Sequence, residues 1–438
     1  MIAAAVHAKL ATLAGELNAA SSHLATKLPA EILATILSHL STQERATAAL
    51  ISKDWLNAFR HSPHIWRETS CYGSNESALA MDEMLKLSGQ TTVDMNVTLS
   101  ESNEDTLIET LENNIPRCKK LYVWFSSDYG WPQIDRLANA LRTAAPRLQS
   151  MWLTDPNSQF LNAEAFEGIN LFDGRADCLT CFQFDGDIDV LRDLDASALR
   201  SVRTASLWQR GRMNSSHLEL LFKLFPAVVY LRVQIQDCEE EEGEAATTPC
   251  IPPASLRSLD IMADTQDSNV LPFLDWVRWQ DIFRVGLETE GYTYPSDRLV
   301  SFLTSTPPTG PNAHHEPLHT AWIDWYDEAN DLDIGISIYM TGSDTPPHVL
   351  LPRNFHGDVP AMTVPERTVY KIKTSVPASM FANITTLYVA ELVFDPMSLP
   401  IPLPPLPTVV DLKIVLMNSH FIKNDLGVSP FVVSLSGL

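Results

Sequence analysis

Residues 27–66 read KLPAEILATILSHLSTQERATAALISKDWLNAFRHSPHIW, and this stretch decides how the N-terminal part of the chain folds. Pro29 stands where a first helix would begin, a position at which the missing N–H of proline has no helical partner to lose. Apolar residues then recur at helical spacing, namely Ile32, Leu33, Ile36, Leu37 and Leu40. Ser41 and Glu44 form an S-x-x-E capping box, which predicts the start of a second helix.

A third helix is predicted around Trp55, Leu56 and Phe59. It must end before Pro63, because the residue before a proline is biased away from helical geometry. A segment of about forty residues is too short to bury so many large apolar side chains within itself. We therefore expect part of this apolar surface to contact another domain or another protein.

The order and spacing of these residues resemble an F-box. The resemblance rests on three segments, which are LPAEIL from Leu28, ISKDW from Ile51 and PHIW from Pro63. It implies that the module docks on a Skp-family adaptor, and through it on a cullin, in a cullin-RING ubiquitin ligase. The adaptor-binding residues that it implies are Leu28, Pro29, Glu31, Ile32, Ile36, Leu40, Ile51 and Trp55. One residue departs from the family pattern, because Arg45 stands where F-boxes usually carry Leu. An unrelated helical bundle is the alternative.

Composition bounds the rest of the chain. With 438 residues and 45% hydrophobic content, it can form more than one domain or one elongated domain. The net charge of −23 argues against nucleic acid as a partner. Six scattered cysteines are typical of a reduced, intracellular protein of the cytoplasm and/or nucleus. No apolar run is long enough to cross a bilayer, so no membrane partner is expected.

The sequence predicts three parts: an N-terminal helix at 1–25, the F-box at 26–70 and a repeat domain at 71–438. In the first part, Val6, Leu10, Leu13 and Leu17 are spaced for one helix face, and we expect this helix to pack on the F-box or its partner. A transit peptide is the alternative for this segment.

Beyond residue 70, a six-residue pattern of the form apolar-x-x-apolar-x-apolar returns about every 30 residues. Its copies begin at Cys118, Leu148, Leu179, Leu199, Val228, Leu256, Ile282, Leu318, Ile384 and Val409, the Leu199 copy being the weakest. A further degraded strand is expected between Leu332 and Ile372.

A helical pattern and a proline precede many copies, as at Leu107-Ile108-Leu111 with Pro116 and at Leu218-Leu221-Leu224 with Pro226. A helix followed by a short strand leaves one face unburied and becomes stable by stacking on copies of itself. The pattern resembles the irregular leucine-rich repeats that often follow an F-box, especially in fungal families. The expected fold class is therefore α/β, a three-helix F-box followed by a leucine-rich-repeat-like solenoid. A doubly wound α/β domain is the main alternative.

The fifth position of each copy is expected to face outward, because alternate side chains of a strand face opposite sides. This row reads Tyr122, Trp152, Gln183, Arg203, Arg232, Asp260, Gly286, Trp322, Tyr388 and Lys413. Aromatic residues and cations often dominate interface energetics. We therefore predict that the row binds an unknown protein substrate, through Tyr122, Trp152, Arg203, Arg232, Trp322 and Tyr388.

Enzyme motifs are weak, and the sequence predicts no catalytic residue, no metal site and no cofactor. The HEPLH run at 315–319 matches a zinc-protease pattern, but Pro317 would break the helix that such a site needs. Asp185, Asp187 and Asp189 lack the spacing of a calcium loop and are predicted to form a solvated turn.

The leading hypothesis for function is a non-catalytic substrate-recognition subunit of an SCF-type ubiquitin ligase, in which the F-box binds the adaptor and the repeats bind the target. Arg45 motivates the alternative, a ligase-independent leucine-rich-repeat scaffold for protein interaction.

Overall fold

The structure is a computed structural model. It describes residues 28–126, 134–155, 170–192, 195–238, 249–263, 272–279, 282, 284–288, 320–327, 334–341, 366–372, 384–390, 408–416 and 431–436. The predicted N-terminal helix at 1–25 and the HEPLH run at 315–319 lie outside these ranges. The chain divides into two compact units, one made of Met1–Leu153 with Leu171–Cys178 and the other of Thr154–Asn170 with Leu179–Leu438.

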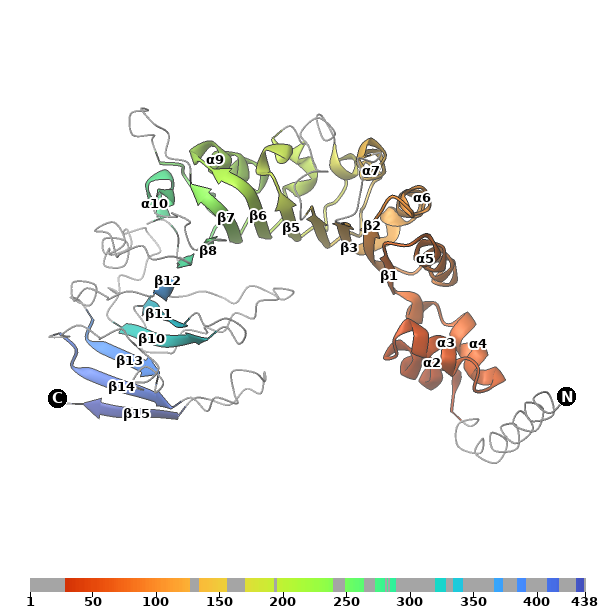
Figure 1. The fold of residues 1–438 in the computed structure, drawn as a ribbon, viewed down its shortest axis with the longest axis horizontal. Coiled ribbons are helices and arrows are strands. Elements are labelled where there is room, and N and C mark those ends of the chain that lie inside the picture. The colour runs from red at the N-terminus through yellow and green to blue at the C-terminus, as the bar shows by residue number, and fades with distance from the viewer. Residues whose placement is uncertain are drawn as a thin grey trace. The chain divides into compact units, whose positions relative to one another are not determined.

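The first unit begins with the predicted helical module. Its helices are α2 (Ala30–Ser38), α3 (Thr42–Ala48), α4 (Lys53–His61) and the 3₁₀ helix η1 (Pro63–Trp66) (Figure 1). The capping box is confirmed, because the Ser41 hydroxyl accepts from the Glu44 N–H and the Glu44 carboxylate accepts from the Ser41 N–H. The local chemistry of the sequence therefore sets where α3 begins.

Four strands follow in the same unit, each preceded by or connected through a helix. The strands are β1 (Glu68–Tyr72), β2 (Val93–Leu99), β3 (Cys118–Phe125) and β4 (Ser150–Thr154). The helices are α5 (Asn75–Leu87), α6 (Glu104–Asn114), η2 (Ile115–Arg117), α7 (Ile134–Ala140) and η3 (Leu171–Gly174). The strand order is β1-β2-β3-β4, and β1 to β3 are parallel. Figure 1 shows α5, α6 and α7 on one face of these strands.

The second unit continues the alternation and then departs from it. Its strands are β5 (Cys181–Gly186), β6 (Thr204–Met213), β7 (Tyr230–Cys238), β8 (Ser258–Ala263), β9 (Arg284–Glu288), β10 (Thr320–Asp327), β11 (Ile334–Thr341), β12 (Glu366–Ile372), β13 (Thr386–Ala390), β14 (Asp411–Leu416) and β15 (Phe431–Ser436). Its helices are η4 (Ile188–Leu191), η5 (Ala196–Leu199), α9 (Ser215–Leu224) and α10 (Phe273–Trp276).

Strands β5 to β9 are parallel and follow chain order, after which the order becomes β9-β12-β11-β10-β13-β14-β15. β11 pairs antiparallel with both β10 and β12, and β15 pairs antiparallel with β14. Two strands, β11 and β12, therefore occupy the interval in which one degraded strand was expected. A uniform parallel repeat is wrong for this part of the chain.

The core of each unit follows the predicted register. In several copies the fourth and sixth positions are almost fully buried, as Leu121 and Val123 in β3 and Leu231 and Val233 in β7 show, whereas Leu412 in β14 is half-buried. The predicted helix residues Leu107, Ile108 and Leu111 of α6, and Leu218, Leu221 and Leu224 of α9, are also buried. Packing of one helix face on one strand face thus recurs along the chain.

The sequence pattern missed β1 and β2. Met95 of β2 pairs with Leu121 of β3 and with Thr69 of β1, so both strands continue the same register. Their buried positions include Thr69 and Cys71 in place of large aliphatic residues, which explains why β1 escaped the pattern. Within the described residues, no helix has the length and apolar character that a membrane span requires.

Candidate functional site: the helical module and the strand rows

The helical module has a small closed core. Leu33, Leu37, Ile65 and Trp66 are buried, and the Trp66 indole N–H donates to the Phe59 carbonyl at 3.0 Å. Trp55 belongs to the same core, because only 8% of it is exposed. It was predicted to bind the adaptor, and the structure places it inside the module instead.

Other large apolar side chains of the module remain exposed. On α2 and just before it, Leu28, Ile32 and Ile36 face solvent, and their spacing of four residues puts them on one helix face. In the turn between α3 and α4, Leu50 is 84% exposed and Ile51 is 50% exposed. We call Leu28, Ile32, Ile36, Leu50 and Ile51 the exposed apolar set.

The structure brings most of the predicted adaptor-binding residues to the surface. Pro29 and Glu31 are exposed beside the exposed apolar set, and Leu40 is half-buried at the end of α2. Leu50 was not predicted, because an apolar residue that follows an Ala-rich helix reads as its buried end. Exposed Leu and Ile side chains that lie together on a small module form the kind of apolar patch that a protein partner covers.

Arg45 points into the module. It is 7% exposed, and its guanidinium donates three hydrogen bonds to backbone carbonyls: Nε to Leu37 at 2.9 Å, Nη1 to Ile65 at 2.6 Å and Nη2 to Ser38 at 3.3 Å. Burial lowers the pKa of Arg45, and the nearby Glu68 carboxylate opposes that shift. The residue that departs from the family pattern is therefore not on the exposed surface.

In the first unit, the predicted substrate row lies on the strand face opposite the core. Tyr122 and Trp152 are half-buried on the strand face opposite the buried Leu121 and Val123, and their ring centroids lie 5.5 Å apart. Trp124, two residues further along β3, is exposed, and its ring centroid lies 5.8 Å from that of Trp152. The structure thus brings three aromatic side chains together, of which the sequence pattern named two.

In the second unit, the register of the row needs a correction at Arg203. Ser206 of β6 pairs with Gln183 of β5 and with Arg232 of β7, so Ser206 occupies the row. Arg203 precedes β6 and is exposed outside it. The weak copy at Leu199 was read three residues too early, because Leu199 belongs to the 3₁₀ helix η5 and not to the approach to the strand.

Arg232 keeps its predicted place and faces a buried carboxylate. It pairs in register with Asp260, whose Oδ2 lies 3.9 Å from Arg232 Nη2 and accepts a 2.6 Å hydrogen bond from the Tyr230 hydroxyl. Burial raises the pKa of Tyr230 well above its usual value, and the Asp260 charge adds to the shift. Further along, Trp322 and Tyr388 pair in register, as do Tyr388 and Lys413.

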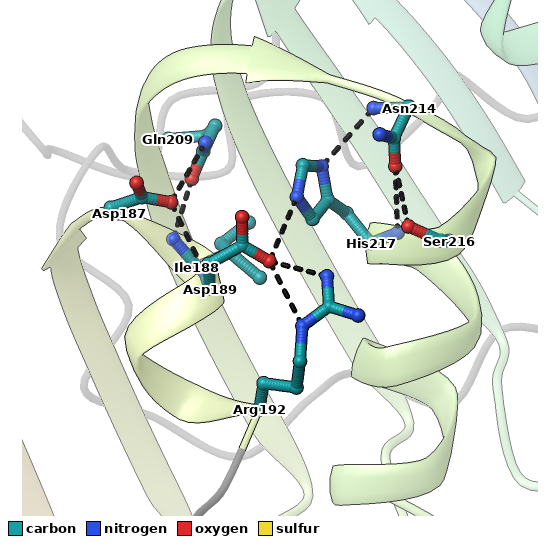
Figure 2. A network of polar contacts seen from close by, with 8 residues as sticks. All are labelled: Asp187, Ile188, Asp189, Arg192, Gln209, Asn214, Ser216 and His217. Carbon is teal, nitrogen blue, oxygen red and sulfur yellow. Dashed lines mark hydrogen bonds and ion pairs between the residues drawn. The ribbon is translucent and has the colours of Figure 1, made fainter. Parts of the chain in front are cut away.

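The aspartates at 185, 187 and 189, which begin at the end of β5, do not form the predicted solvated turn. Asp185 is buried, Asp187 accepts from the Asp189 N–H, and Asp189 binds two side chains. Figure 2 shows the His217 ring between Asp189 and Asn214, with Nε2 at 3.2 Å from Asp189 Oδ1 and Nδ1 at 3.1 Å from the Asn214 N–H. Because Nδ1 accepts from a backbone N–H, the proton of the neutral ring lies on Nε2 and points to the carboxylate.

This network connects two successive helical segments. Arg192 also binds Asp189, and the Gln209 side chain of β6 accepts from the Ile188 N–H at 2.7 Å (Figure 2). Burial of Asp189 opposes ionisation, but the contacts with Arg192 and His217 outweigh it and lower the pKa of this carboxyl. The network therefore fastens η4 to the N-terminus of α9.

Among the residues that the structure describes, no group of His, Cys, Asp and Glu could hold a metal ion. None of the six cysteines, which all lie in the described ranges, forms a disulfide, and Cys178 is exposed.

Comparison with protein families matches residues 25–71 to the F-box-like model. No curated protein matches the chain. The matched range contains α2, α3, α4 and η1, and thus the buried core and the exposed apolar set described above. The chain carries an F-box-like domain at residues 25–71.

Proposed function

We propose that this chain is the substrate-recognition subunit of an SCF-type cullin-RING ubiquitin ligase. The observation that carries the proposal is the F-box-like domain with Leu and Ile side chains left exposed on it. F-box domains bind Skp-family adaptors, and the exposed apolar set is the surface that such an adaptor would cover. Through the adaptor, the chain would join a cullin in the cytoplasm and/or nucleus.

The mechanism is proximity, and the chain need contribute no catalytic residue. Tethering the target beside a ubiquitin-loaded enzyme raises the effective concentration of a target lysine. Other subunits perform the bond chemistry. The target itself is an unknown protein.

We further propose that residues 71–438 form a leucine-rich-repeat-like solenoid that holds the target. Support comes from β1 to β4 and β5 to β9, which pair in chain order within each unit. Described helices of the first unit lie on one face of its strands, whereas a doubly wound domain has helices on both faces (Figure 1). The aromatic cluster of Tyr122, Trp124 and Trp152 is the favoured binding surface.

A ligase-independent scaffold is the alternative. Its motive is that Arg45 stands where F-boxes usually carry Leu, and the burial of Arg45 inside the module weighs against it. No other feature of the described residues favours it over adaptor binding.

Co-purification tests the proposal. We expect the full chain to retain a Skp-family adaptor and, through it, a cullin, and we expect Leu28→Ala with Pro29→Ala to reduce the retained adaptor. Leu79→Ala is the matched control, because Leu79 is an apolar residue of α5 that is 52% exposed outside the domain. A wild-type chain that retains no adaptor contradicts the proposal and favours the scaffold.

A further inference from the structure

We propose that Arg45 is a positioning residue for the adaptor-binding surface, which it stabilises through three backbone carbonyls while contacting no partner itself. This inference rests on the proposed function. Its basis is the geometry of the guanidinium, whose Nε, Nη1 and Nη2 reach the carbonyls of Leu37, Ile65 and Ser38. Arg45 is thereby bonded to α2 and η1 while it belongs to α3.

The carbonyls at the end of α2 need such a donor. The last turn of a helix has carbonyls without intrahelical partners, and these carry the negative end of the helix dipole. A guanidinium offers five N–H donors in a planar fork and keeps its charge, so one side chain can satisfy carbonyls from two segments. The Leu37 carbonyl also accepts from the Leu40 N–H at 3.1 Å, so loss of the guanidinium removes one of its two donors. The cost is greatest at Leu37 and Ile65, which are buried.

The helices that Arg45 joins also carry the exposed apolar set. Ile32 and Ile36 lie on α2, and Leu50 and Ile51 follow α3, whose Ala49 N–H donates to the Arg45 carbonyl at 3.0 Å. If the arrangement of α2 and α3 is only partly populated, the apparent Kd rises by the inverse of that population. Arg45 would therefore act on affinity from inside the module.

The experiment measures binding of a purified Skp-family adaptor to the full chain. Arg45→Met keeps a long side chain and removes its donors, and we expect it to weaken binding about tenfold, chiefly through slower association, because fewer free chains hold the binding arrangement. Arg45→Lys restores one charged donor group, and we expect it to recover binding to within about threefold of wild type.

Arg117→Met is the matched control, because Arg117 is a half-buried arginine whose guanidinium also donates to the carbonyls at a helix end. Its Nη2 donates to the Leu85 carbonyl of α5 at 2.8 Å, and its Nη1 donates to the Thr91 carbonyl at 3.0 Å. This variant should lower stability and leave adaptor affinity within about twofold of wild type, since it lies outside the domain.

A folded Arg45→Met chain that binds with the wild-type Kd overturns the inference. Equal losses for Arg45→Met and Arg117→Met also overturn it, because stability alone would then explain both. If Arg45→Met fails to fold, Arg45→Lys carries the test, because one ammonium group cannot reach carbonyls on both segments as the planar guanidinium does. Its Kd should then lie about threefold above the wild-type value, and an unchanged Kd overturns the inference. A wild-type chain that does not bind overturns the proposed function itself.

Discussion

At the scale of single residues, two arginines donate hydrogen bonds to backbone carbonyls at helix ends, Arg45 from a buried position and Arg117 from a half-buried one. Arg45 and Arg117 each lie at the C-terminal end of a helix and donate to its last carbonyls. Burial lowers the pKa of both guanidinium groups. Each guanidinium stabilises the end of a helix against a neighbouring segment. The identity of the residue as arginine does not predict this role.

Arg117→Met should lower the free energy of unfolding by about 3 kcal/mol, because hydrogen bonds to charged groups contribute more than neutral ones and the carbonyls stay buried. Urea titration of the full chain measures the change. Arg175→Met serves as the control, since Arg175 is largely exposed beside Asp173 and its loss should change the value by less than about 0.5 kcal/mol. Equal effects for both variants would contradict the assigned role of Arg117.

The residue scale also shows where the sequence misleads about the candidate site. Trp55 has the composition of an interface residue, yet it fills the core of the module. Leu50 looks like the buried end of an amphipathic helix, yet it is the most exposed of the exposed apolar set. Spacing along a helix fixes which residues share a face and does not fix which face the neighbouring helices cover.

At the scale of elements, alternation in the strands predicts the core well. Leu121 with Val123 and Leu231 with Val233 could be assigned from sequence, since residues two apart share a strand face. Strand order and direction after β9 could not be assigned from sequence. The antiparallel pairs of β11 with β10 and β12 leave no mark in the alternation of residues that would distinguish them from parallel pairs. Register at Arg203 failed for a related reason, as only pairing with β5 and β7 fixes it.

The polar network of η4 and α9 makes stability depend on acid pH. Its Asp189 has a lowered pKa in the folded chain, so its contribution is present above the unfolded-state pKa of about 3.9 and is lost as the pH falls through the folded-state value. Between about pH 5 and about pH 3, the free energy of unfolding should therefore fall less in Asp189→Asn than in the wild type. The difference should be less than about 1 kcal/mol, because Asp189 is partly exposed.

Denaturant midpoints of the wild type and the variant at the two pH values test this. The variant keeps His217 and Arg192, which both face Asp189, so the difference between the two chains reports on the loss of the Asp189 carboxylate and its contacts. Identical pH profiles for the two chains would show that the network does not hold Asp189 ionised.

The aromatic cluster is the element that we expect to bind the target. Trp124→Ala with Trp152→Ala should weaken capture of the target by at least tenfold, because clustered Trp and Tyr side chains tend to dominate binding. Proteins that accumulate when the chain is deleted should also accumulate when this double variant replaces it. Leu79→Ala is the control variant, and the double variant should still bind the adaptor. Normal turnover of those proteins in cells with the double variant would show that the target binds elsewhere on the chain.

At the scale of the whole molecule, an F-box-like domain at residues 25–71 is followed by a long α/β region. The net charge of −23 over 438 residues argues against nucleic acid as a main partner. The order and spacing of the apolar residues in the first seventy residues predicted the domain. They could not predict which apolar residues of the domain would remain exposed.

Calorimetric titration of the full chain with a purified Skp-family adaptor tests the central claim most directly. We predict saturable one-to-one binding with a negative heat-capacity change, because the adaptor would remove the exposed apolar set from water. Ile32→Asp with Ile51→Asp should abolish that signal, and Leu79→Asp should leave it unchanged. Absence of binding by the wild-type chain, or equal binding by the Ile32 and Ile51 double variant, would contradict the claim that this exposed surface holds the adaptor.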